Sequence, residues 1–495
     1  MKLHHLLNGV KVASILGNKY MNIEGLSYDS KQLKTGGLFF VVKGAKHNGA
    51  DFVDEALERG AACIVSEEDV ITYKSVCKVK VENVRKACAR MAANFYSYPS
   101  QSLNVIGITG TNGKTTTLYL IDAILRHIGA SCGTIGTTGY SAGSRNIPAL
   151  NTTPSSLMLQ MLMSEMVKSN FSHCTMEVSS HALHQHRVEG IRFKSAIFTN
   201  LSKEHLDYHN DMDEYFKAKN ILFETLSDDS YAIVNADDDY AKKIMDSTKG
   251  RVLTYGTGFH ANVIGYDTNL SLNSSSFKVR SPYGQLQITT PLIGEYNMYN
   301  ILAAITFALS QNIDIRSIEE AIQNFQGAPG RLQRIDCGQD FLVFVDYAHT
   351  DDALKNVLST LRKIAKKKII VVFGCGGDRD TSKRPRMGSV AAQLADYAII
   401  ANDNPRSEEP ERIARDISKG FPKGFKNFHI SLDRRDAIEL ALSTAEKSDI
   451  VLIAGKGHEK YQIFEDHTID FDDCKVCEEL LGKEDPLQEE NVYVT

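Results

Sequence analysis

The sequence has no long hydrophobic run. None of its apolar stretches approaches the roughly 18 consecutive residues that a membrane-spanning helix requires. Its first 21 residues also lack the unbroken apolar stretch and the small-residue cleavage site of a signal peptide. We therefore expect a cytoplasmic protein that has no membrane partner.

The sequence also lacks a strong excess of charge of either sign. Its 56 Lys and Arg residues against 61 Asp and Glu residues leave a formal net charge of −5 at pH 7. Such a balance gives the protein no general attraction to the phosphates of nucleic acids. We expect no nucleic-acid partner.

Cysteine is sparse and scattered, with nine residues in the whole chain. In a chain of this length, that distribution indicates reduced thiols rather than a disulfide framework. Cys474 and Cys477 form a C-x-x-C motif, but no second pair stands at the spacing of a zinc site. We interpret them as two half-buried residues of a helix rather than as a metal or redox site.

What is present is the composition of an ordinary globular protein, with 42% hydrophobic and 24% charged residues. A length of 495 residues corresponds to roughly three domains of about 150 residues each. Tyr98-Pro99-Ser100 suits one boundary, because a residue before proline is disfavoured in a helix, and Gly327–Gly330 suits the other. The predicted domains are residues 1–100, 101–331 and 332–495.

The order of the apolar runs predicts an α/β fold throughout. In the central domain, β-branched runs indicate buried strands of a parallel sheet, at residues 104–109, 175–178, 195–200 and 232–235. In the last domain, four apolar runs alternate with helix-length segments, at residues 341–349, 367–375, 397–403 and 449–455. That alternation is typical of a doubly wound, Rossmann-like domain.

A glycine-rich loop connects the first of the central strands to an amphipathic helix that begins near Lys114. Glycines let the backbone form a nest of N–H donors, and the helix N-terminus adds positive potential, so the loop suits phosphate. Lys114 is placed to reach the β- and γ-phosphates and Thr115 to ligate Mg²⁺, although the first glycine, Gly107, departs by one position from the common P-loop spacing. The predicted phosphate-binding residues are Gly110, Thr111, Asn112, Gly113, Lys114, Thr115 and Thr116.

Glu177 ends an apolar strand of the same domain, where open α/β sheets place functional groups. A carboxylate in this position is costly unless it is paired or bound to a metal ion. Two interpretations stay open from the residues alone. Glu177 holds a divalent metal ion for phosphoryl transfer, or it forms a salt bridge with a local lysine.

A series of motifs, spread in order over nearly the whole chain, resembles the Mur ligase family. The motifs are YDSKQLKTGGLFF (28–40), GITGTNGKTTT (107–117), MEVSSH (176–181), TNLSKEHLDYHNDMDEYFKAK (199–219), GEYNMYN (294–300), PGRLQ (329–333) and VDYAHTDDAL (345–354). Within that family, the early YDSKQ block and the late GCGGDRD, DNPR and GKGHE segments are similar to the enzymes that add the third amino acid to a cell-wall precursor. The match is highly specific.

The resemblance implies an ATP-dependent, ADP-forming ligase that works through an acyl phosphate and uses two magnesium ions. It implies that Thr115 and Glu177 hold the first ion and that Glu177 and His205 serve the second. Lys219 matches the carbamylated lysine of the family, since alignment on Y-x-x-A-K favours it over Lys217. The residues implied in catalysis are Lys114, Glu177, His205 and Lys219, and those implied at the metal ions are Thr115, Glu177, His205 and Lys219.

Further residues match family positions around ATP and the nucleotide-sugar peptide. Around ATP they are Asn297, Arg331, Asp346 and His349, although Asn297 also suits the N-cap of a helix. Around UDP-N-acetylmuramoyl-L-alanyl-D-glutamate they are Ser30, Asn151, Thr152, Thr153, Ser179, Gln185 and Arg187. Ser30, whose hydroxyl is able to donate to a phosphate or sugar oxygen, also fits an ordinary turn serine.

The incoming amino acid implied by the resemblance is meso-2,6-diaminopimelate. Arg406 suits its distal carboxylate, which lysine lacks, and Glu459 suits an ammonium group. The alternative for Arg406 is that it caps a helix starting near Ser407, which the helix dipole disfavours. The matching residues are Arg379, Asp403, Asn404, Pro405, Arg406, Gly455 and Glu459.

Three alternatives remain beside this hypothesis. The chain is a ligase that adds L-lysine instead, a ligase similar to folylpolyglutamate synthetase, or a non-catalytic P-loop protein that regulates a partner. The YDSKQ and DNPR segments argue against the folate enzyme, and Glu177, His205 and Lys219 would have no purpose in a regulatory protein. We expect a monomer.

Overall fold

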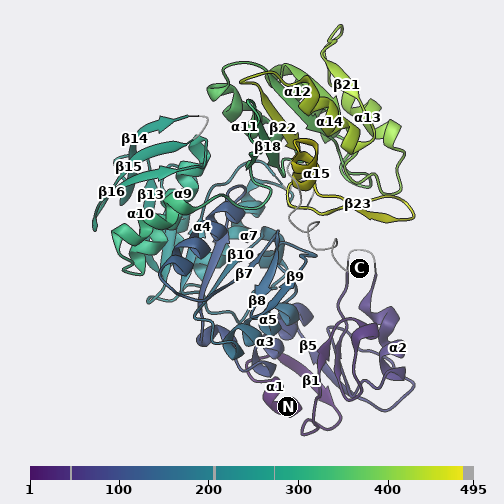
Figure 1. Ribbon diagram of the computed structural model, residues 1–495. Coiled ribbons are helices and arrows are strands. Elements are labelled where there is room, and N and C mark those ends of the chain that lie inside the picture. The colour runs from purple at the N-terminus through teal and green to yellow at the C-terminus, as the bar shows by residue number, and fades with distance from the viewer. Residues whose placement is uncertain (45–46, 205–207, 272–273, 483–495) are drawn as a thin grey trace, which may run out of the picture. The chain divides into compact units, whose positions relative to one another are not determined.

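The computed structural model describes residues 1–44, 47–204, 208–271 and 274–482 (Figure 1). The chain divides into two compact units. The first unit comprises Met1–Tyr266, Lys278–Ile288 and Tyr299–Ile322, and the second comprises Asp267–Phe277, Thr289–Met298 and Gln323–Thr495. This division does not test the domain boundaries expected near residues 100 and 331, which stay predictions.

The N-terminal part of the first unit contains a five-stranded sheet in the order β1-β5-β4-β3-β2. β1 is antiparallel to β5, and the other neighbours are parallel. Because alternate side chains of a strand point to opposite faces, Phe40 and Val65 enter one hydrophobic core while Phe39 and Ile64 enter another. The elements are α1 (Leu3–Leu6), β1 (Val12–Leu16), β2 (Leu26–Ser27), β3 (Leu38–Phe40), α2 (Val53–Glu58), β4 (Cys63–Ser66), β5 (Cys77–Val81) and α3 (Val84–Phe95).

An eleven-stranded sheet follows, in the order β16-β15-β14-β13-β12-β11-β6-β10-β7-β8-β9. Its central strands, from β7 to β14 in this order, are parallel, as the apolar runs predict, and β8 and β9 add an antiparallel edge. The strands are β6 (Asn104–Thr109), β7 (Cys132–Gly136), β8 (Gly139–Ala142), β9 (Arg145–Ile147), β10 (His173–Glu177), β11 (Ser195–Phe198), β12 (Tyr231–Asn235), β13 (Arg251–Gly256), β14 (Val263–Leu270), β15 (Ser275–Ser281) and β16 (Gly284–Thr290). The helices are α4 (Lys114–His127), α5 (Ser156–Lys168), α6 (Ser180–His184), α7 (Met212–Glu224), α8 (Ala241–Ser247), α9 (Glu295–Ser310) and α10 (Ile315–Asn324).

The second unit contains a six-stranded sheet in the order β17-β18-β22-β19-β20-β21. All neighbours are parallel except β17 and β18. Two hydrophobic cores, one on each face, make it a doubly wound layer structure, which confirms the α/β prediction. The strands are β17 (Gln333–Ile335), β18 (Leu342–Asp346), β19 (Ile369–Phe373), β20 (Tyr397–Ile400), β21 (Phe428–Ile430) and β22 (Ile450–Ala454), with β23 (Tyr461–Ile463) and β24 (Thr468–Asp470) as a separate hairpin. The helices are α11 (Asp351–Ile364), α12 (Lys383–Leu394), α13 (Pro410–Ser418), α14 (Arg434–Thr444) and α15 (Asp473–Leu480).

Side-chain caps show why several helices begin where they do. Asn83, Ser155, Asp211 and Thr350 each accept a hydrogen bond from a backbone N–H in the first turn of the helix that follows. Such a cap satisfies one of the donors that a helix N-terminus otherwise leaves without a partner, and it stabilises the helix by about 1 kcal/mol. The starts of α3, α5, α7 and α11 are therefore determined locally.

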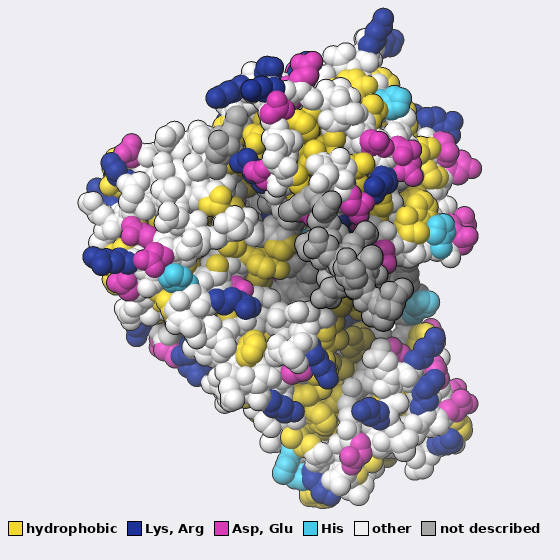
Figure 2. All heavy atoms as spheres, viewed as in Figure 1, with side chains coloured by type: hydrophobic (Ala, Val, Ile, Leu, Met, Phe, Trp, Pro, Cys, Tyr) yellow, Lys and Arg dark blue, Asp and Glu magenta, His cyan; other side chains and the backbone are white. Residues whose placement is uncertain are grey.

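The state of the cysteines and the charges on the surface were both expected from the composition. Cys474 and Cys477 both lie on α15, as expected for helix residues. Cys474 is half-buried, but Cys477 is fully buried, so the expectation that both are half-buried is wrong for Cys477. All nine cysteines are free thiols. On the face shown in Figure 2, basic side chains are interspersed with acidic ones. Within the described part of the chain, no helix combines the length and the apolar character needed to cross a membrane.

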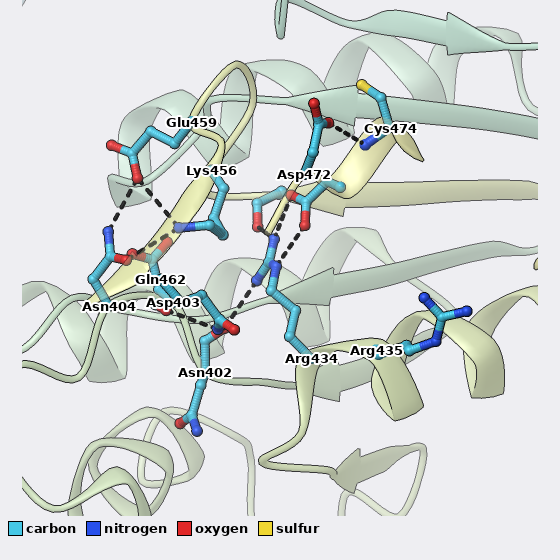
Figure 3. Close-up of polar contacts among 12 residues, drawn as sticks. Asn402, Asp403, Asn404, Arg434, Arg435, Lys456, Glu459, Gln462, Asp472 and Cys474 are labelled. Carbon is cyan, nitrogen blue, oxygen red and sulfur yellow. Dashed lines mark hydrogen bonds and ion pairs between the residues drawn. The ribbon is translucent and has the colours of Figure 1, made fainter. Parts of the chain in front are cut away.

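A fully buried ion pair joins α14 to α15 in the second unit. Arg434 and Asp473 both have 0% side-chain exposure, and the guanidinium donates from Nε at 2.7 Å and from Nη2 at 2.8 Å to the two carboxylate oxygens. Arg434 also donates to the carbonyl oxygens of Asn402 and Ala454, which follow β20 and end β22 (Figure 3). The pair therefore holds two strand ends and the last described helix together.

We expect Asp473→Asn to lower the free energy of unfolding of the second unit by about 3–5 kcal/mol, because it leaves a buried guanidinium without its counter-charge. The measurement is urea denaturation followed by circular dichroism. The matched control is Glu479→Gln, which breaks the neighbouring but exposed Arg435–Glu479 pair between the same two helices. That control should cost at most about 1 kcal/mol. Equal losses in the two variants would contradict the importance of the buried pair.

Candidate functional site

The glycine-rich loop runs from the end of β6 to the start of α4, as predicted. Gly110 and Gly113 have positive φ angles of 147° and 86°. A Cβ atom on Gly110 would lie 1.9 Å from Thr199 Oγ1, and one on Gly113 would lie 2.2 Å from Asn300 Oδ1. Glycine is therefore required at both positions for conformation and for space. Gly107, by contrast, lies inside β6, where a Cβ atom would meet the ring of Phe193, so it serves packing rather than the loop.

The loop is preorganised around the start of α4. The Lys114 ammonium donates to the carbonyl oxygens of Gly110 at 2.9 Å and Thr111 at 2.7 Å, and thus curls back over the loop. The Asn112 N–H donates to Asn200 Oδ1 at 3.0 Å. Thr115 and Thr116 are buried in the first turn of the helix. The structure thus brings together all seven residues predicted to bind phosphate.

Glu177 lies beside this loop at the end of β10 and is 1% exposed. Its Oε1 accepts hydrogen bonds from the Thr115 hydroxyl at 3.0 Å and from the Thr137 N–H at 2.9 Å. Its Oε2 accepts from the Thr137 hydroxyl at 3.1 Å. A Cβ atom on Gly136 would lie 2.5 Å from Oε1, so this glycine permits the approach. The carboxylate is satisfied by neutral donors, and these contacts do not include the lysine salt bridge considered from the sequence.

The donor set suits magnesium. Mg²⁺ is commonly bound by one or two carboxylates together with substrate phosphates and water. The Thr115 hydroxyl and the Glu177 carboxylate supply oxygen ligands 3.0 Å apart at the end of the phosphate loop. His205, expected at a second ion, lies outside the described residues. In the described ranges, no cluster of three or more His, Cys, Asp or Glu residues forms a metal site by itself.

Lys219 is buried on α7 next to the same loop. Its side chain is 2% exposed, and its ammonium donates to the Gly110 carbonyl at 2.8 Å and lies 4.5 Å from the centre of the Tyr215 ring. Burial lowers the pKa of Lys219 well below its ordinary value, and the nearby charge of Lys114 lowers it further. Lys217, two residues earlier, is exposed to solvent. Lys219 is therefore the buried lysine of the two, and it is also the one that the Y-x-x-A-K motif favours.

Most residues expected to contact the muramoyl peptide gather around Glu177. The Thr153 hydroxyl donates to the Glu177 carbonyl at 2.8 Å and accepts from the Ser179 N–H at 3.0 Å. Arg187 donates to the Thr153 carbonyl at 2.7 Å and to Gln185 Oε1 at 2.9 Å. Thr152 contacts Thr137, and Asn151 accepts a hydrogen bond from Tyr140. Thr153, Ser179, Gln185 and Arg187 therefore form one connected network, with Thr152 and Asn151 next to it.

Ser30 stands apart from that network in the N-terminal sheet region. It is buried in a short 3₁₀ helix, Ser30–Gln32, and its hydroxyl donates to Glu55 Oε2 at 2.8 Å. The donation to a phosphate or sugar considered from the sequence is therefore not available in this arrangement. The lone pairs of the hydroxyl oxygen remain as acceptors.

The residues expected at ATP in the second unit surround Tyr347. Asp346 accepts from the backbone N–H groups of Leu332 at 2.6 Å and Ala348 at 2.8 Å, and burial raises its pKa although the charge of Arg331 opposes the shift. The Arg331 guanidinium lies 4.9 Å from the centre of the Tyr347 ring. His349 Nδ1 lies 2.9 Å from the Tyr347 carbonyl oxygen, and burial lowers the pKa of this histidine.

Asn297 does not cap a helix, so that alternative is wrong. Helix α9 begins at Glu295, two residues earlier. The Asn297 amide instead donates to the carbonyl of Ile293 at 2.9 Å. This hydrogen bond thus fixes the backbone just before the first turn of α9.

A second group of expected residues lies at the carboxyl ends of β20 and β22 (Figure 3). The Asn404 amide donates to Glu459 Oε2 at 3.0 Å, and a Cβ atom on Gly455 would lie 2.9 Å from Asp403 Oδ2. Arg406 has a φ of 53° and donates from Nη1 to the Gly377 carbonyl at 2.8 Å. These residues and Pro405 form one group, and Arg379 lies on the Gly376–Asp380 segment that Arg406 contacts.

The alternative in which Arg406 caps a helix is also wrong. Helix α13 begins at Pro410, and its N-cap is Glu409. Arg406 lies in the turn before this helix, where its backbone N–H donates to Ile463. Its guanidinium is therefore directed by the turn and not by a helix terminus.

Sequence reasoning missed three polar residues of these groups. Thr137 holds Glu177, and Lys456 and Gln462 hold the turn after β20, through Asn404 Oδ1 at 3.1 Å and the Asp403 carbonyl at 3.0 Å. A usable signal existed for Lys456, because it follows the apolar run of β22 in the GKGHE segment. The other two carry no signal in the sequence, since threonine and glutamine are ordinary surface residues.

We expect Gly113→Ala to weaken nucleotide binding by at least about tenfold, because the added methyl group would displace the buried Asn300 amide and distort the phosphate loop. Titration calorimetry with ATP measures the Kd. The matched control is Gly129→Ala, which also has a positive φ of 76° but open space where the Cβ would stand. It should lose stability and retain its nucleotide affinity. Unchanged affinity in Gly113→Ala would show that the loop tolerates the methyl group and does not bind phosphate closely.

Comparison with known proteins agrees with this geometry. Three family models match the chain: the Mur ligase family catalytic domain at residues 22–96, the Mur ligase middle domain at 108–308, and the Mur ligase glutamate ligase domain at 330–457. A protein of Caldanaerobacter subterraneus is 44% identical over 98% of this chain and 99% of its own length, and one of Geobacillus thermodenitrificans is 43% identical over 96% and 98%. Both are named UDP-N-acetylmuramoyl-L-alanyl-D-glutamate–2,6-diaminopimelate ligase.

A solved structure of the same name is 32% identical, covers 97% of this chain and 98% of its own, and superposes with a TM-score of 0.70. Because the superposition covers nearly the whole of both chains, the two proteins share one fold over almost their full length. Relatives of this identity and extent show that the chain belongs to the Mur ligase family and has its three-domain fold.

Proposed function

We propose that this protein uses ATP to ligate meso-2,6-diaminopimelate to UDP-N-acetylmuramoyl-L-alanyl-D-glutamate, with release of ADP and phosphate. The observation that carries the proposal is the close arrangement of the phosphate loop, Glu177 and the buried Lys219. A loop that only binds nucleotide needs neither the buried carboxylate nor the buried lysine. The names of the 44% and 43% identical relatives support the choice of substrates.

The proposed reaction has two chemical steps. A carboxylate oxygen of the dipeptide attacks the γ-phosphorus of ATP, so that an acyl phosphate forms and ADP leaves. The amine of diaminopimelate then attacks the acyl carbon, phosphate leaves, and the amine nitrogen loses its proton. Phosphoryl transfer of this kind depends mainly on positioning and on positive charge around the migrating group.

The residues of the loop serve the first step. Lys114 and the N–H groups at the start of α4 bind the phosphates. Thr115 and Glu177 would hold Mg²⁺, and His205 would serve a second ion, as the family resemblance implies. Bound magnesium would offset the negative charge that builds up on the phosphate oxygens. Arg331 is proposed to face the migrating phosphate, and Asn297, Asp346 and His349 to contact the nucleotide.

Lys219 is proposed to act as a carbamate. A neutral lysine amine adds to CO₂ to give the carbamate anion and a proton, so a buried amine of lowered pKa is suited to the reaction. The product is an anion, which resolves the difficulty of an ammonium group next to magnesium ions. The contact with the Gly110 carbonyl keeps the nitrogen beside the phosphate loop.

We expect Lys219→Ala to lower the turnover by about 10–100-fold or more, as loss of a group that supports a metal site does. Added formate or acetate should restore part of the activity by supplying the missing anion. The measurement is phosphate release with both substrates present. Lys217→Ala, on the exposed neighbour, should stay near the unmodified rate. Full activity of Lys219→Ala without added carboxylate would end the carbamate proposal.

The second unit supports the choice of amino acid. Diaminopimelate carries an ammonium and a carboxylate at each end, whereas lysine lacks the distal carboxylate. Arg406 is proposed to bind that carboxylate and Glu459 to hold an ammonium, with Arg379, Asp403, Asn404, Pro405 and Gly455 completing the site. With lysine bound, a desolvated arginine would lose its partner, at a cost of about 1–3 kcal/mol.

We expect kcat/KM for meso-diaminopimelate to exceed that for L-lysine or L-ornithine by about 5- to 150-fold in a side-by-side ligation assay. Arg406→Met should remove most of this preference, because it removes the partner of the distal carboxylate. Arg412→Met, on an exposed arginine of α13, is the control and should keep the preference. Equal use of lysine by the unmodified protein would refute the specificity, and turnover that needs a folate instead of the UDP-linked peptide would refute the function.

The proposed enzyme is a monomer of the cytoplasm. The free state of all nine cysteines suits a reducing compartment. The two proposed substrates, the UDP-linked dipeptide and free diaminopimelate, are small polar molecules. Size-exclusion chromatography with light scattering tests the monomer.

A further inference from the structure

Lys456 is an unusual lysine, because its side chain has 0% exposure. It is the second residue after β22, and its ammonium lies 3.1 Å from Asn404 Oδ1 and 3.3 Å from Glu459 Oε2 (Figure 3). A buried ammonium is costly unless it is paired and hydrogen-bonded. Both partners, Asn404 and Glu459, are residues of the proposed amino-acid site, whereas Lys456 itself has no role in the proposed reaction steps.

The contact with Lys456 determines which way the Asn404 amide points. Asn404 Oδ1 accepts from two donors, the Lys456 ammonium at 3.1 Å and the backbone N–H of Ile463 at 3.0 Å. A flipped amide would place its own NH₂ group against both donors, so the flip is excluded. Asn404 Nδ2 must then face Glu459 Oε2, which it reaches at 3.0 Å.

The same lysine determines which oxygen of Glu459 is left for a ligand. Oε2 accepts from Asn404 and from Lys456 and is therefore committed to the protein. Within the described residues, the contact of Oε1 is a long one, with the Tyr347 hydroxyl at 3.5 Å. An incoming ammonium group would thus meet Glu459 through Oε1, with the carboxylate plane already set by the two bonds on the other oxygen.

The charges around Lys456 hold it in place. Asp403, Glu459 and Asp473 attract the ammonium, while Arg434 repels it. Burial lowers the pKa of Lys456, and the attraction of Asp403 opposes that shift. The ammonium therefore lies between the turn after β20 and the turn after β22, and it connects the two strand ends on which the amino-acid site is built.

We propose that Lys456 is a positioning residue of the amino-acid site, which orients the Asn404 amide and the Glu459 carboxylate so that one carboxylate oxygen is presented to the ammonium of the incoming amino acid. The inference deepens the proposed function and rests on it. Loss of Lys456 should then weaken the use of diaminopimelate specifically, because ATP and the UDP-linked dipeptide are proposed to bind through other residues.

The test compares Lys456→Met with Lys460→Met, an exposed lysine four residues further along. In the ligation assay, Lys456→Met should raise the KM for meso-diaminopimelate by about tenfold or more, which is the effect of losing hydrogen bonds to a charged group. Its KM values for ATP and the UDP-linked dipeptide, and all three KM values of Lys460→Met, should stay within about twofold of the unmodified protein.

A double variant separates positioning from a general structural role. If Lys456 acts through Glu459, the loss in Lys456→Met/Glu459→Gln should fall well short of the product of the two single losses. Losses that multiply in full, or KM values that rise equally for all three substrates, would overturn the inference. Circular dichroism and thermal melting check the fold, with Lys456→Gln as a second variant, and failure of both Lys456 variants to fold would equally overturn it.

The unmodified protein distinguishes this inference from the proposed function. If it does not ligate diaminopimelate, the proposed function fails at the first measurement. If it does so and Lys456→Met has an unchanged KM for diaminopimelate, only the positioning role fails.

Discussion

The in-register pairing of the parallel strands β10, β6 and β11 is the constraint on which the first site depends. Glu177 pairs with Ile108, and Phe198 pairs with Thr109. The chain therefore leaves all three strands at one edge of the sheet, where the glycine loop packs against Thr199. A slip of one residue between β10 and β6 would turn the side chains of β10 to the opposite face and move Glu177 away from Thr115.

Burial and the neighbouring groups together determine whether each buried basic side chain is stable in its charged or in its neutral form. Arg434 and Lys456 are buried cations that contact carboxylates, so each is stable as a charged group. Lys219 is equally buried, but it contacts a backbone carbonyl and an aromatic ring and lies near the positive charge of Lys114. Desolvation therefore favours the neutral amine at Lys219, which is the form that reacts with an electrophile such as CO₂. A buried lysine therefore has a structural role at position 456 and is suited to a chemical reaction at position 219.

The sequence-based hypotheses succeeded where a local pattern carries its own physical reason. The glycine loop needs positive φ angles and contact space, and both requirements can be read from Gly110 and Gly113. The alternatives in which Asn297 and Arg406 cap a helix failed, because each residue stands close to a helix start without capping it. The position of a helix start depends on tertiary packing within one or two residues, so a capping role cannot be assigned from composition alone. Ser30 is a similar case, because only the fold brings Glu55 close enough to accept a hydrogen bond from its hydroxyl.

The sequence by itself determined the family, the α/β order of the elements and the position of the glycine-rich loop, because each can be read from short-range spacing without knowledge of the fold. Only the tertiary structure decided which oxygen of Glu459 is committed to the protein, which lysine of the Lys217–Lys219 pair is buried, and which groups hold Glu177. These depend on contacts between residues that are far apart in the chain, such as Thr137 with Glu177 and Lys456 with Asn404. Their energies arise from desolvation and hydrogen-bond geometry, which do not exist until the strands are paired and water is excluded.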